Sequence, residues 1–187
     1  LAEGIDVFVN DAFSCSHRAH ASCEAITACL PSYAGALMMA ELSALDQALG
    51  QPRRPVAAVV GGAKVSTKLD LLQNLITKVD VLIVGGGMAN TFLLADGHDI
   101  GASLVESDMI DTAKAIREQA AASGCRFVLP QDGVVATAFA ANAPHQLVHF
   151  ANDHIAGNEM ILDAGRDAVA TISAAIDDCQ TLIWNGP

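Results

Sequence analysis

Short, nearly continuous apolar segments alternate with longer amphipathic segments along this chain. The short apolar segments cover residues 5–9, 56–60, 81–84, 126–129 and 181–184. Their continuous hydrophobicity predicts strands that are buried on both faces. Apolar residues recur at helical spacing in segments 33–49, 66–78, 88–96, 108–123 and 166–178. This alternation predicts an α/β fold, in which helices flank a parallel sheet and the crossovers are right-handed.

Two of the expected helices carry more specific signals. In the helix 33–49, an apolar stripe is formed by Met38, Leu42, Leu45 and Leu49. Ser66 stands where it can cap the amino end of the helix 66–78.

A polar break, Gln51-Pro52-Arg53-Arg54-Pro55, follows the helix 33–49. It predicts that residues 1–32 end one domain, that 33–50 form a connecting helix, and that 51–187 belong to a second α/β domain. The chain begins on Leu1 and stops at a turn signal, Asn185-Gly186-Pro187. We therefore expect it to be a fragment of a longer protein.

Composition narrows the class of protein. The chain has 187 residues, 52% hydrophobic and 17% charged, with a net charge of −11, so it can bury a sizeable core. The acidic balance argues against nucleic-acid binding, which needs clustered Lys and Arg. No apolar run reaches membrane-span length. The five cysteines are odd in number and irregularly spaced, which favours a reducing, cytosolic setting over a disulfide framework.

The strongest candidate for chemistry is Gly61-Gly62-Ala63-Lys64, with Lys68 four residues further on. Glycines at a strand end allow a ligand to approach the backbone. Spacing of four on a helix would place both lysines on one face. Two ammonium groups beside a helix amino end would suit a phosphorylated ligand.

Glycine-rich or polar sequences also follow two other predicted strands, Gly85-Gly86-Gly87 and Asn185-Gly186. Because parallel strands end at one edge, these segments should line the same crevice. Neither glycine cluster fits the Walker A or the dinucleotide-binding pattern. Tight packing of strands on helices, with no ligand, is the alternative interpretation.

A second polar cluster, from Asn10 to His20, follows the first strand. Arg18 could pair with a carboxylate or a phosphate through two hydrogen bonds, and His17 and His20 could add donors. Cys15, His17, His20 and Cys23 could instead be zinc ligands, although their spacing is not that of common zinc sites. A solvated polar loop is the third interpretation.

Other candidates have simpler explanations. Asp132 could hold a metal or cap a helix, and capping is the commoner role. Cys29, Cys125 and Cys179 are expected to be small buried residues. We expect Trp184 to anchor the core.

Several segments together resemble the phosphoglycerate kinase family. The resemblance runs in family order from end to end of the chain and covers a little under half of a full-length member. The matching motifs are Asp6-Val7-Phe8-Val9-Asn10-Asp11-Ala12-Phe13 with His17-Arg18-Ala19-His20, Gly61-Gly62-Ala63-Lys64-Val65-Ser66, Gly85-Gly86-Gly87-Met88-Ala89-Asn90-Thr91-Phe92, Leu129-Pro130 with Asp132, and Trp184-Asn185-Gly186-Pro187.

The resemblance implies a Rossmann-like three-layer fold in a partial two-domain kinase. Residues 1–32 would end the phosphoglycerate-binding domain, 33–50 would be the interdomain hinge helix, and 51–187 would be an incomplete nucleotide-binding domain. The implied reaction is reversible phosphoryl transfer from 1,3-bisphosphoglycerate to ADP, giving 3-phosphoglycerate and ATP in glycolysis, with Mg²⁺ accompanying the nucleotide. The full-length enzyme would be cytoplasmic and monomeric, and the fragment itself is expected to be inactive.

By the same resemblance, Lys64 and Arg18 would be catalytic, and His17 and Arg18 would bind the phosphoglycerate. The residues implied in nucleotide binding are Gly62, Lys64, Lys68, Gly86, Gly87, Leu104, Leu162 and Asn185. Within this chain the resemblance assigns no metal ligand.

This sequence departs from the family pattern at several positions. Thr67 stands where many members have Asp, Ser14-Cys15-Ser16 replaces Gly-Thr-Ala, and Arg166 replaces Pro. Two other hypotheses stand beside the kinase. The substitutions at Ser14–Ser16 and Arg166 support a non-catalytic, nucleotide-binding relic of the same fold. A zinc-dependent interaction domain would instead be built on Cys15, His17, His20 and Cys23.

Overall fold

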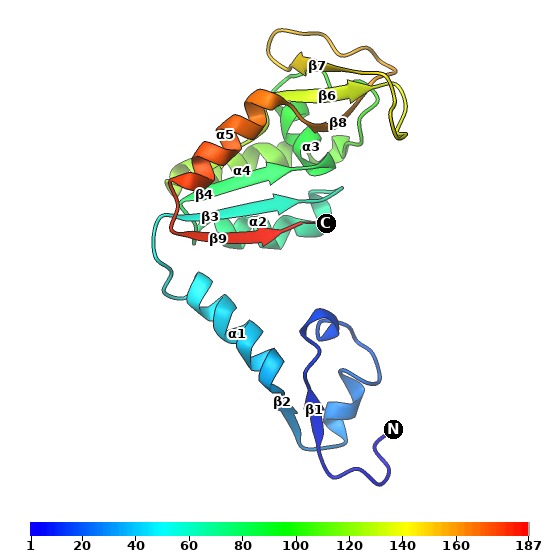
Figure 1. The fold of residues 1–187 in the computed structure, drawn as a ribbon, viewed down its shortest axis with the longest axis vertical. Coiled ribbons are helices and arrows are strands. Elements are labelled where there is room, and N and C mark those ends of the chain that lie inside the picture. Colours follow the sequence, from blue (N-terminus) through cyan, green and yellow to red (C-terminus); the bar gives the residue numbers. More distant parts are fainter. Residues whose placement is uncertain (187) are drawn as a thin grey trace. The chain divides into compact units, whose positions relative to one another are not determined.

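In a computed structural model that describes residues 1–186, the chain divides into two units, Leu1–Pro52 and Arg53–Pro187 (Figure 1). Pro187, the last residue of the predicted Trp-Asn-Gly-Pro motif, lies outside the described residues. Each unit has its own strands and helices and is described separately.

The first unit is built on a pair of short parallel strands, β1 (Phe8–Asn10) and β2 (Ser32–Ala34). Two 3₁₀ turns, η1 (Phe13–Cys15) and η2 (Ala25–Ala28), lie between these strands in the chain, and helix α1 (Ala36–Leu49) follows β2. The Asp11 carboxylate accepts a hydrogen bond of 2.9 Å from the Met38 N–H, which satisfies a donor in the first turn of α1.

Two expectations for the first unit need correction. The first strand begins at Phe8 rather than at residue 5, and the helix begins at Ala36 because residues 32–34 pair with β1 as a strand. Within the predicted apolar stripe of α1, Met38 is buried, but Leu42 and Leu45 are 44% and 39% exposed. The stripe therefore does not form a continuous buried face.

The second unit contains the predicted parallel sheet, which has four strands in the order β5-β4-β3-β9. These strands are β3 (Val56–Gly61), β4 (Val81–Gly85), β5 (Arg126–Val128) and β9 (Thr181–Asn185). The accompanying helices are α2 (Leu69–Ile76), α3 (Gly87–Ala95), α4 (Ile110–Ala122) and α5 (Arg166–Asp177), with 3₁₀ turns η3 (Ser66–Lys68) and η4 (Ser107–Met109). The α/β fold and all four strands are confirmed.

Helices cover both faces of this sheet, so that it forms the middle of three layers. On one face, Ile172, Ala175 and Ile176 of α5 pack against strand residues including Ala57 and Ile83. Neighbouring residues along a strand point to opposite faces, and Leu82 and Val84 are buried on the other face. Figure 1 shows α5 in front of the sheet and α2 and α4 behind it.

A second sheet was not predicted from the sequence. It is antiparallel, with the order β7-β6-β8, and consists of β6 (Asp132–Ala136), β7 (His145–His149) and β8 (Met160–Ala164). A separate apolar core lies between this sheet and α3, formed by Leu93, Ile100, Val135, Val148, Phe150 and Ile155. The sheet places β8 beside the start of α5 and next to the parallel sheet (Figure 1).

Three expectations about individual side chains are wrong. Lys68 occupies the N-cap position of α2, and the Ser66 side chain instead donates a hydrogen bond to Glu106. Trp184 is 69% exposed because β9 is an edge strand of the parallel sheet. Cys29 is exposed, whereas Cys125 is buried as expected and Cys179 is half-buried.

Candidate functional site

The order of the parallel strands creates a switch point beside β3. Strand β4 pairs with one edge of β3 and β9 pairs with the other. Helix α2, which follows β3 in the chain, and helix α5, which precedes β9, lie on opposite faces of the sheet (Figure 1). In open α/β sheets, ligands bind outside the carboxyl ends of strands at such a point. The ends of β3 and β9 therefore define a candidate binding crevice.

The three strand ends that the sequence singled out do meet at one edge. Gly61 is in register with Gly85, and Val60 is in register with Asn185. The prediction that these glycine-rich and polar segments share an edge is confirmed. Ligand groups at this edge would meet backbone rather than bulky side chains.

Lys68 spans the switch point. Its Nζ donates a hydrogen bond of 2.8 Å to the Gly61 carbonyl and a second hydrogen bond to the Asn185 Oδ1. The side chain therefore ties the end of β3 to the end of β9, and it is half-buried. An ammonium group has three N–H donors, so one more donor can be directed at an anion in the crevice.

Gly86 is required where the β4–α3 turn meets the β3–α2 loop. Its φ angle is +68°, a conformation that side chains rarely adopt. A Cβ atom at this position would lie 3.0 Å from the Gly62 carbonyl oxygen, which already accepts a hydrogen bond of 2.8 Å from the Met88 N–H. The glycines thus serve tight backbone packing, as the alternative interpretation expected, and this packing also shapes the edge of the crevice.

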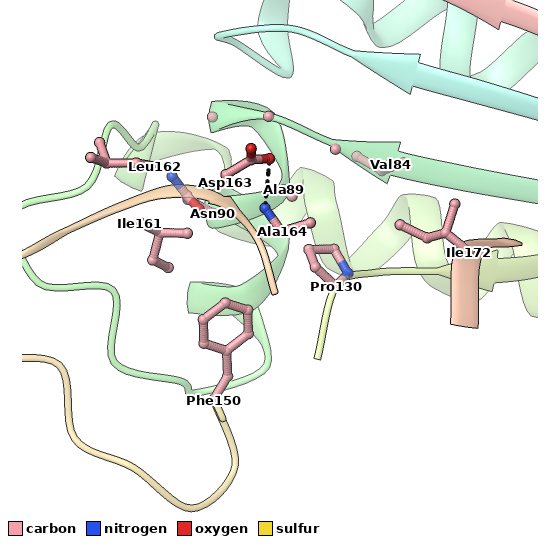
Figure 2. A pocket seen from close by; sticks show the side chains of 13 residues that line it. Val84, Ala89, Asn90, Pro130, Phe150, Ile161, Leu162, Asp163, Ala164 and Ile172 are labelled. Carbon is pink, nitrogen blue, oxygen red and sulfur yellow. Dashed lines mark hydrogen bonds between the residues drawn. The ribbon is translucent and has the colours of Figure 1, made fainter. Parts of the chain in front are cut away.

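A mostly apolar cavity of about 230 Å³ opens beside these glycines (Figure 2). The residues lining it come from β4, α3, β8, α5 and the segments between them: Val84, Gly85, Gly86, Gly87, Ala89, Asn90, Pro130, Phe150, Ile161, Leu162, Asp163, Ala164 and Ile172. Figure 2 shows the Asn90 amide and the Asp163 carboxylate as the polar side-chain groups among them. Such a cavity suits a flat, largely apolar ring with a few polar edge atoms.

The candidate nucleotide residues do not all line this cavity. Gly86, Gly87 and Leu162 do, while Gly62, Lys68 and Asn185 lie along the neighbouring strand ends. Leu104 is exposed, and its side chain lies beside Gly87, where an added Cβ would stand 3.1 Å from Leu104 Cδ2. The structure therefore collects these residues at one end of the second unit.

Lys64 lies in the loop between β3 and η3, and its side chain is exposed. The argument that Lys64 and Lys68 share a helix face is therefore wrong, because Lys64 precedes the first helical turn. The Thr67 hydroxyl donates a hydrogen bond of 3.0 Å to the Lys64 carbonyl, which folds the loop back on itself.

Glu106 anchors this loop, and sequence reasoning missed it. Its carboxylate accepts hydrogen bonds from the Ser66 N–H, at 3.0 Å, and from the Ser66 hydroxyl. The Glu106 N–H in turn donates to the Thr91 hydroxyl of α3 at 3.2 Å. Partial burial opposes ionisation of Glu106, but the Ser66 hydrogen bonds and the Lys64 charge outweigh it and lower the pKa of Glu106 below its usual value.

Asp132 caps α5 from the neighbouring strand β6. Its carboxylate accepts hydrogen bonds from the Asp167 N–H at 3.1 Å and from the Ala168 N–H at 2.6 Å. Gly165 leaves the space that the carboxylate occupies. The capping role is confirmed for Asp132, and it holds the helix whose first turn follows the cavity-lining residues Asp163 and Ala164.

The remaining candidates lie in the first unit. His17, Arg18 and His20 are exposed in the turns after η1. Cys15 and Cys23 are in contact, with 3.9 Å between their sulfur atoms. Within residues 1–186, however, no group of three or more His, Cys, Asp or Glu side chains is arranged to hold a metal ion. The geometry therefore gives no support to the four-ligand zinc hypothesis.

The whole chain, residues 1–187, matches the family profile described as phosphoglycerate kinase. A phosphoglycerate kinase of Rhodospirillum centenum is 58% identical over 182 residues, which are 97% of this chain and 46% of that protein. One of Ruegeria pomeroyi is 60% identical over 182 residues, which are 97% of this chain and 45% of that protein. The chain thus spans about half the length of the curated relatives it matches.

Solved structures of phosphoglycerate kinases are also similar to this chain over about half of their own length. The phosphoglycerate kinase structure from Coxiella burnetii superposes with a TM-score of 0.86 at 44% identity, covering 97% of this chain and 46% of that one. The structure from Pyrococcus horikoshii OT3 superposes with a TM-score of 0.80 at 26% identity, with the same coverage of both chains.

Proposed function

Because the chain belongs to the phosphoglycerate kinase family, we propose that its parent protein transfers a phosphoryl group between 1,3-bisphosphoglycerate and ADP. The products are 3-phosphoglycerate and ATP, and the reaction is a step of glycolysis. The chain spans less than half of its relatives, and on its own it is inactive in this proposal. In this proposal the full-length enzyme is a cytoplasmic monomer. Separately, no helix within residues 1–186 is both long and apolar enough to cross a membrane.

The observation that carries this proposal is the bridge formed by Lys68 at the switch point. A lysine held between the ends of β3 and β9 places a positive charge where α/β sheets bind ligands. Polyphosphates are attracted to such a focused charge even on a protein that is acidic overall. In this proposal Lys68 and Asn185 bind the nucleotide phosphates.

The adjoining cavity is the proposed site for the adenine ring. Gly86, Gly87 and Leu162 line it, and Gly62 and Leu104 lie at its border next to Gly86 and Gly87. The Asn90 side chain is held by a hydrogen bond of 3.0 Å to the Leu104 carbonyl, so it is a positioned polar group at the wall. This arrangement fits the mixed apolar and polar character of a nucleobase.

Lys64 is the proposed catalytic lysine of the second unit. Phosphoryl transfer depends mainly on in-line positioning and on positive charge around the moving group. The exposed Lys64 ammonium, on a loop anchored through Ser66 and Glu106, can supply such a charge. Mg²⁺ arrives with the nucleotide phosphates as part of the substrate and neutralises part of their charge.

Arg18 and His17 are the proposed phosphoglycerate-binding residues. A guanidinium group can bind a carboxylate or phosphate through two parallel hydrogen bonds, and both side chains are exposed in the first unit. We assign residues 1–32 to the phosphoglycerate-binding domain, 33–50 to an interdomain hinge that contains α1, and 51–187 to the nucleotide-binding domain. Closure about the hinge would exclude water from the reacting groups.

Substitution of Lys64 tests the catalytic assignment in the full-length protein. Lys64→Ala should lower kcat by roughly 10²- to 10³-fold, the usual loss for one preorganised charge or donor in a transition state. The matched control is Lys78→Ala, which removes an exposed lysine just before the amino end of β4. A near-normal kcat for Lys64→Ala would refute the assignment. Nucleotide binding without turnover in the unmodified protein would favour the non-catalytic relic instead.

Substitution of Arg18 tests whether the first unit binds phosphoglycerate while the second unit binds the nucleotide. Arg18→Ala should raise KM for phosphoglycerate about tenfold or more, because one charge-assisted hydrogen bond to a ligand is worth about that much. The KM for the nucleotide should change little. If the affinity for the nucleotide fell instead, Arg18 would bind the nucleotide rather than phosphoglycerate, and its assignment would be wrong.

A further inference from the structure

Two cysteine side chains in the first unit lie in contact and have no part in the proposed reaction. The Cys15 and Cys23 thiols share a weak hydrogen bond, with 3.9 Å between the two Sγ atoms. Both residues are half-buried. Between them in the sequence stand His17, Arg18 and His20, so this thiol pair closes the loop that carries the proposed phosphoglycerate-binding residues.

Short-range backbone hydrogen bonds fold the loop between the two cysteines. The Arg18 N–H donates a hydrogen bond of 3.1 Å to the Cys15 carbonyl, and the Cys23 N–H donates one of 3.0 Å to the His20 carbonyl. A disulfide requires an S–S distance of about 2.05 Å, so the sulfurs have to approach by roughly 2 Å. Rotation about the two χ1 angles and a shift of the loop have to supply this approach.

We propose that Cys15 and Cys23 form a reversible dithiol–disulfide pair, which clamps the loop 16–22 when it is oxidised. The oxidant is a low-molecular-weight disulfide, such as oxidised glutathione. We further infer that the clamp weakens binding of a phosphoglycerate, and this consequence rests on the proposed function of Arg18 and His17.

The chemistry is an ordinary thiol–disulfide exchange. One cysteine thiolate attacks a sulfur of the small disulfide, forms a mixed disulfide and releases one small thiolate. The second cysteine thiolate then attacks the protein sulfur of the mixed disulfide, forms the Cys15–Cys23 bond and releases the second small thiolate. The protein loses two protons and two electrons, and the small disulfide is reduced to two thiols.

The hydrogen bond within the thiol pair favours the protonated Cys15 thiol over its thiolate and, together with desolvation, raises the pKa of Cys15 above its usual value. Because the thiolate is the attacking species, Cys15 reacts more readily at mildly alkaline pH than at neutral pH. The oxidation is therefore best carried out under mildly alkaline conditions, and dithiothreitol should reverse it.

Peptide mapping of the full-length protein tests the pair directly. Trypsin cleaves after Arg18, which lies between the two cysteines, and next after Arg53. After treatment with oxidised glutathione and alkylation of free thiols, the peptide ending at Arg18 should stay linked to peptide 19–53 until a reductant is added. The link should be absent from Cys15→Ser and Cys23→Ser and should persist in Cys29→Ser, the matched control within the same peptide.

Two mapping results would overturn the pair. One is alkylation of both Cys15 and Cys23 after oxidation, and the other is loss of the link in Cys29→Ser.

The effect of the disulfide on phosphoglycerate binding is tested by steady-state kinetics on the same samples. Oxidation should raise KM for 3-phosphoglycerate about tenfold, the value of one misaligned charge-assisted hydrogen bond, with KM for the nucleotide unchanged.

The kinetic effect should vanish in Cys15→Ser and Cys23→Ser and should be reversed by dithiothreitol. Complete oxidation with unchanged KM for 3-phosphoglycerate, or with equal changes for both substrates, would overturn control by the clamp. If the reduced protein showed no turnover at all, the proposed function would be refuted, and the peptide map would still decide the disulfide.

Discussion

Replacing Asp132 by alanine should destabilise the second unit, because this carboxylate caps α5 although it belongs to a different element. The side chain is 6% exposed, and its two oxygens accept hydrogen bonds from the N–H groups of Asp167 and Ala168. Helix α5 covers one face of the parallel sheet and lines the cavity through Ile172. Loss of the cap should therefore affect stability first and the cavity second.

The loss in free energy of unfolding can be estimated from the hydrogen bonds and the charge that Asp132→Ala removes. Removal of an N-cap side chain costs about 1–2 kcal/mol. Ala168 is only 1% exposed, so its N–H is left without water, which adds about 1 kcal/mol. Loss of a negative charge at the helix amino end adds a few tenths of a kcal/mol. The sum is about 3 kcal/mol, which corresponds to a fall in Tm of roughly 10 °C for a unit of this size.

Urea unfolding of the 187-residue chain, followed by far-ultraviolet circular dichroism, measures this loss. Asp132→Asn keeps the volume and an acceptor oxygen, and it should cost about 1 kcal/mol. The matched control is Asp167→Asn, which alters an exposed carboxylate in the first turn of the same helix and should cost a few tenths of a kcal/mol.

The order Asp132→Ala, Asp132→Asn, Asp167→Asn, from largest loss to smallest, is therefore expected. Amide exchange adds a local measurement, since the Ala168 N–H should exchange faster in Asp132→Ala and not in Asp167→Asn. If Asp132→Ala cost no more than Asp167→Asn, the capping argument would be refuted. Should Asp132→Ala fail to fold, Asp132→Asn with amide exchange still decides the question.

Two further predictions concern the stability of the second unit. Gly165→Ala should lower the free energy of unfolding in urea by about 2–3 kcal/mol, because its Cβ would overlap the Asp132 carboxylate. The control Gly157→Ala should be neutral, since a Cβ added there meets nothing within 4 Å. Equal effects of the two substitutions would contradict this explanation. For Glu106 the folded pKa is lowered from a reference value of 4.5, so its stabilising charge acts above that pH and is lost as the pH falls through the folded pKa. The stability gap between wild type and Glu106→Gln should thus be widest near neutral pH and close under acid conditions, and a gap that stayed constant with pH would rule out the charge as its cause.

The parallel sheet could be predicted from local sequence because its strands are buried on both faces. Strands such as β3 and β4 carry an unbroken run of apolar residues, which leaves little doubt about their existence or approximate ends. The antiparallel sheet carries a weaker signal. Strand β7 reads His145-Gln146-Leu147-Val148-His149, and four of its five residues are exposed or half-buried. Its pairing depends on β6, which the local pattern of β7 does not reveal.

The α/β class, the parallel strands, and the placement of glycines and Asn185 at strand ends can all be predicted from local sequence. Which side chains meet at those strand ends depends on how the elements pack. Lys68 bonds to Asn185 across 117 positions of sequence, Ser66 to Glu106 across 40, and Ala168 to Asp132 across 36. The reason is physical: hydrophobic periodicity reports which face of an element is buried, whereas a hydrogen bond between distant elements depends on strand order, register and helix placement. These are properties of the packed fold.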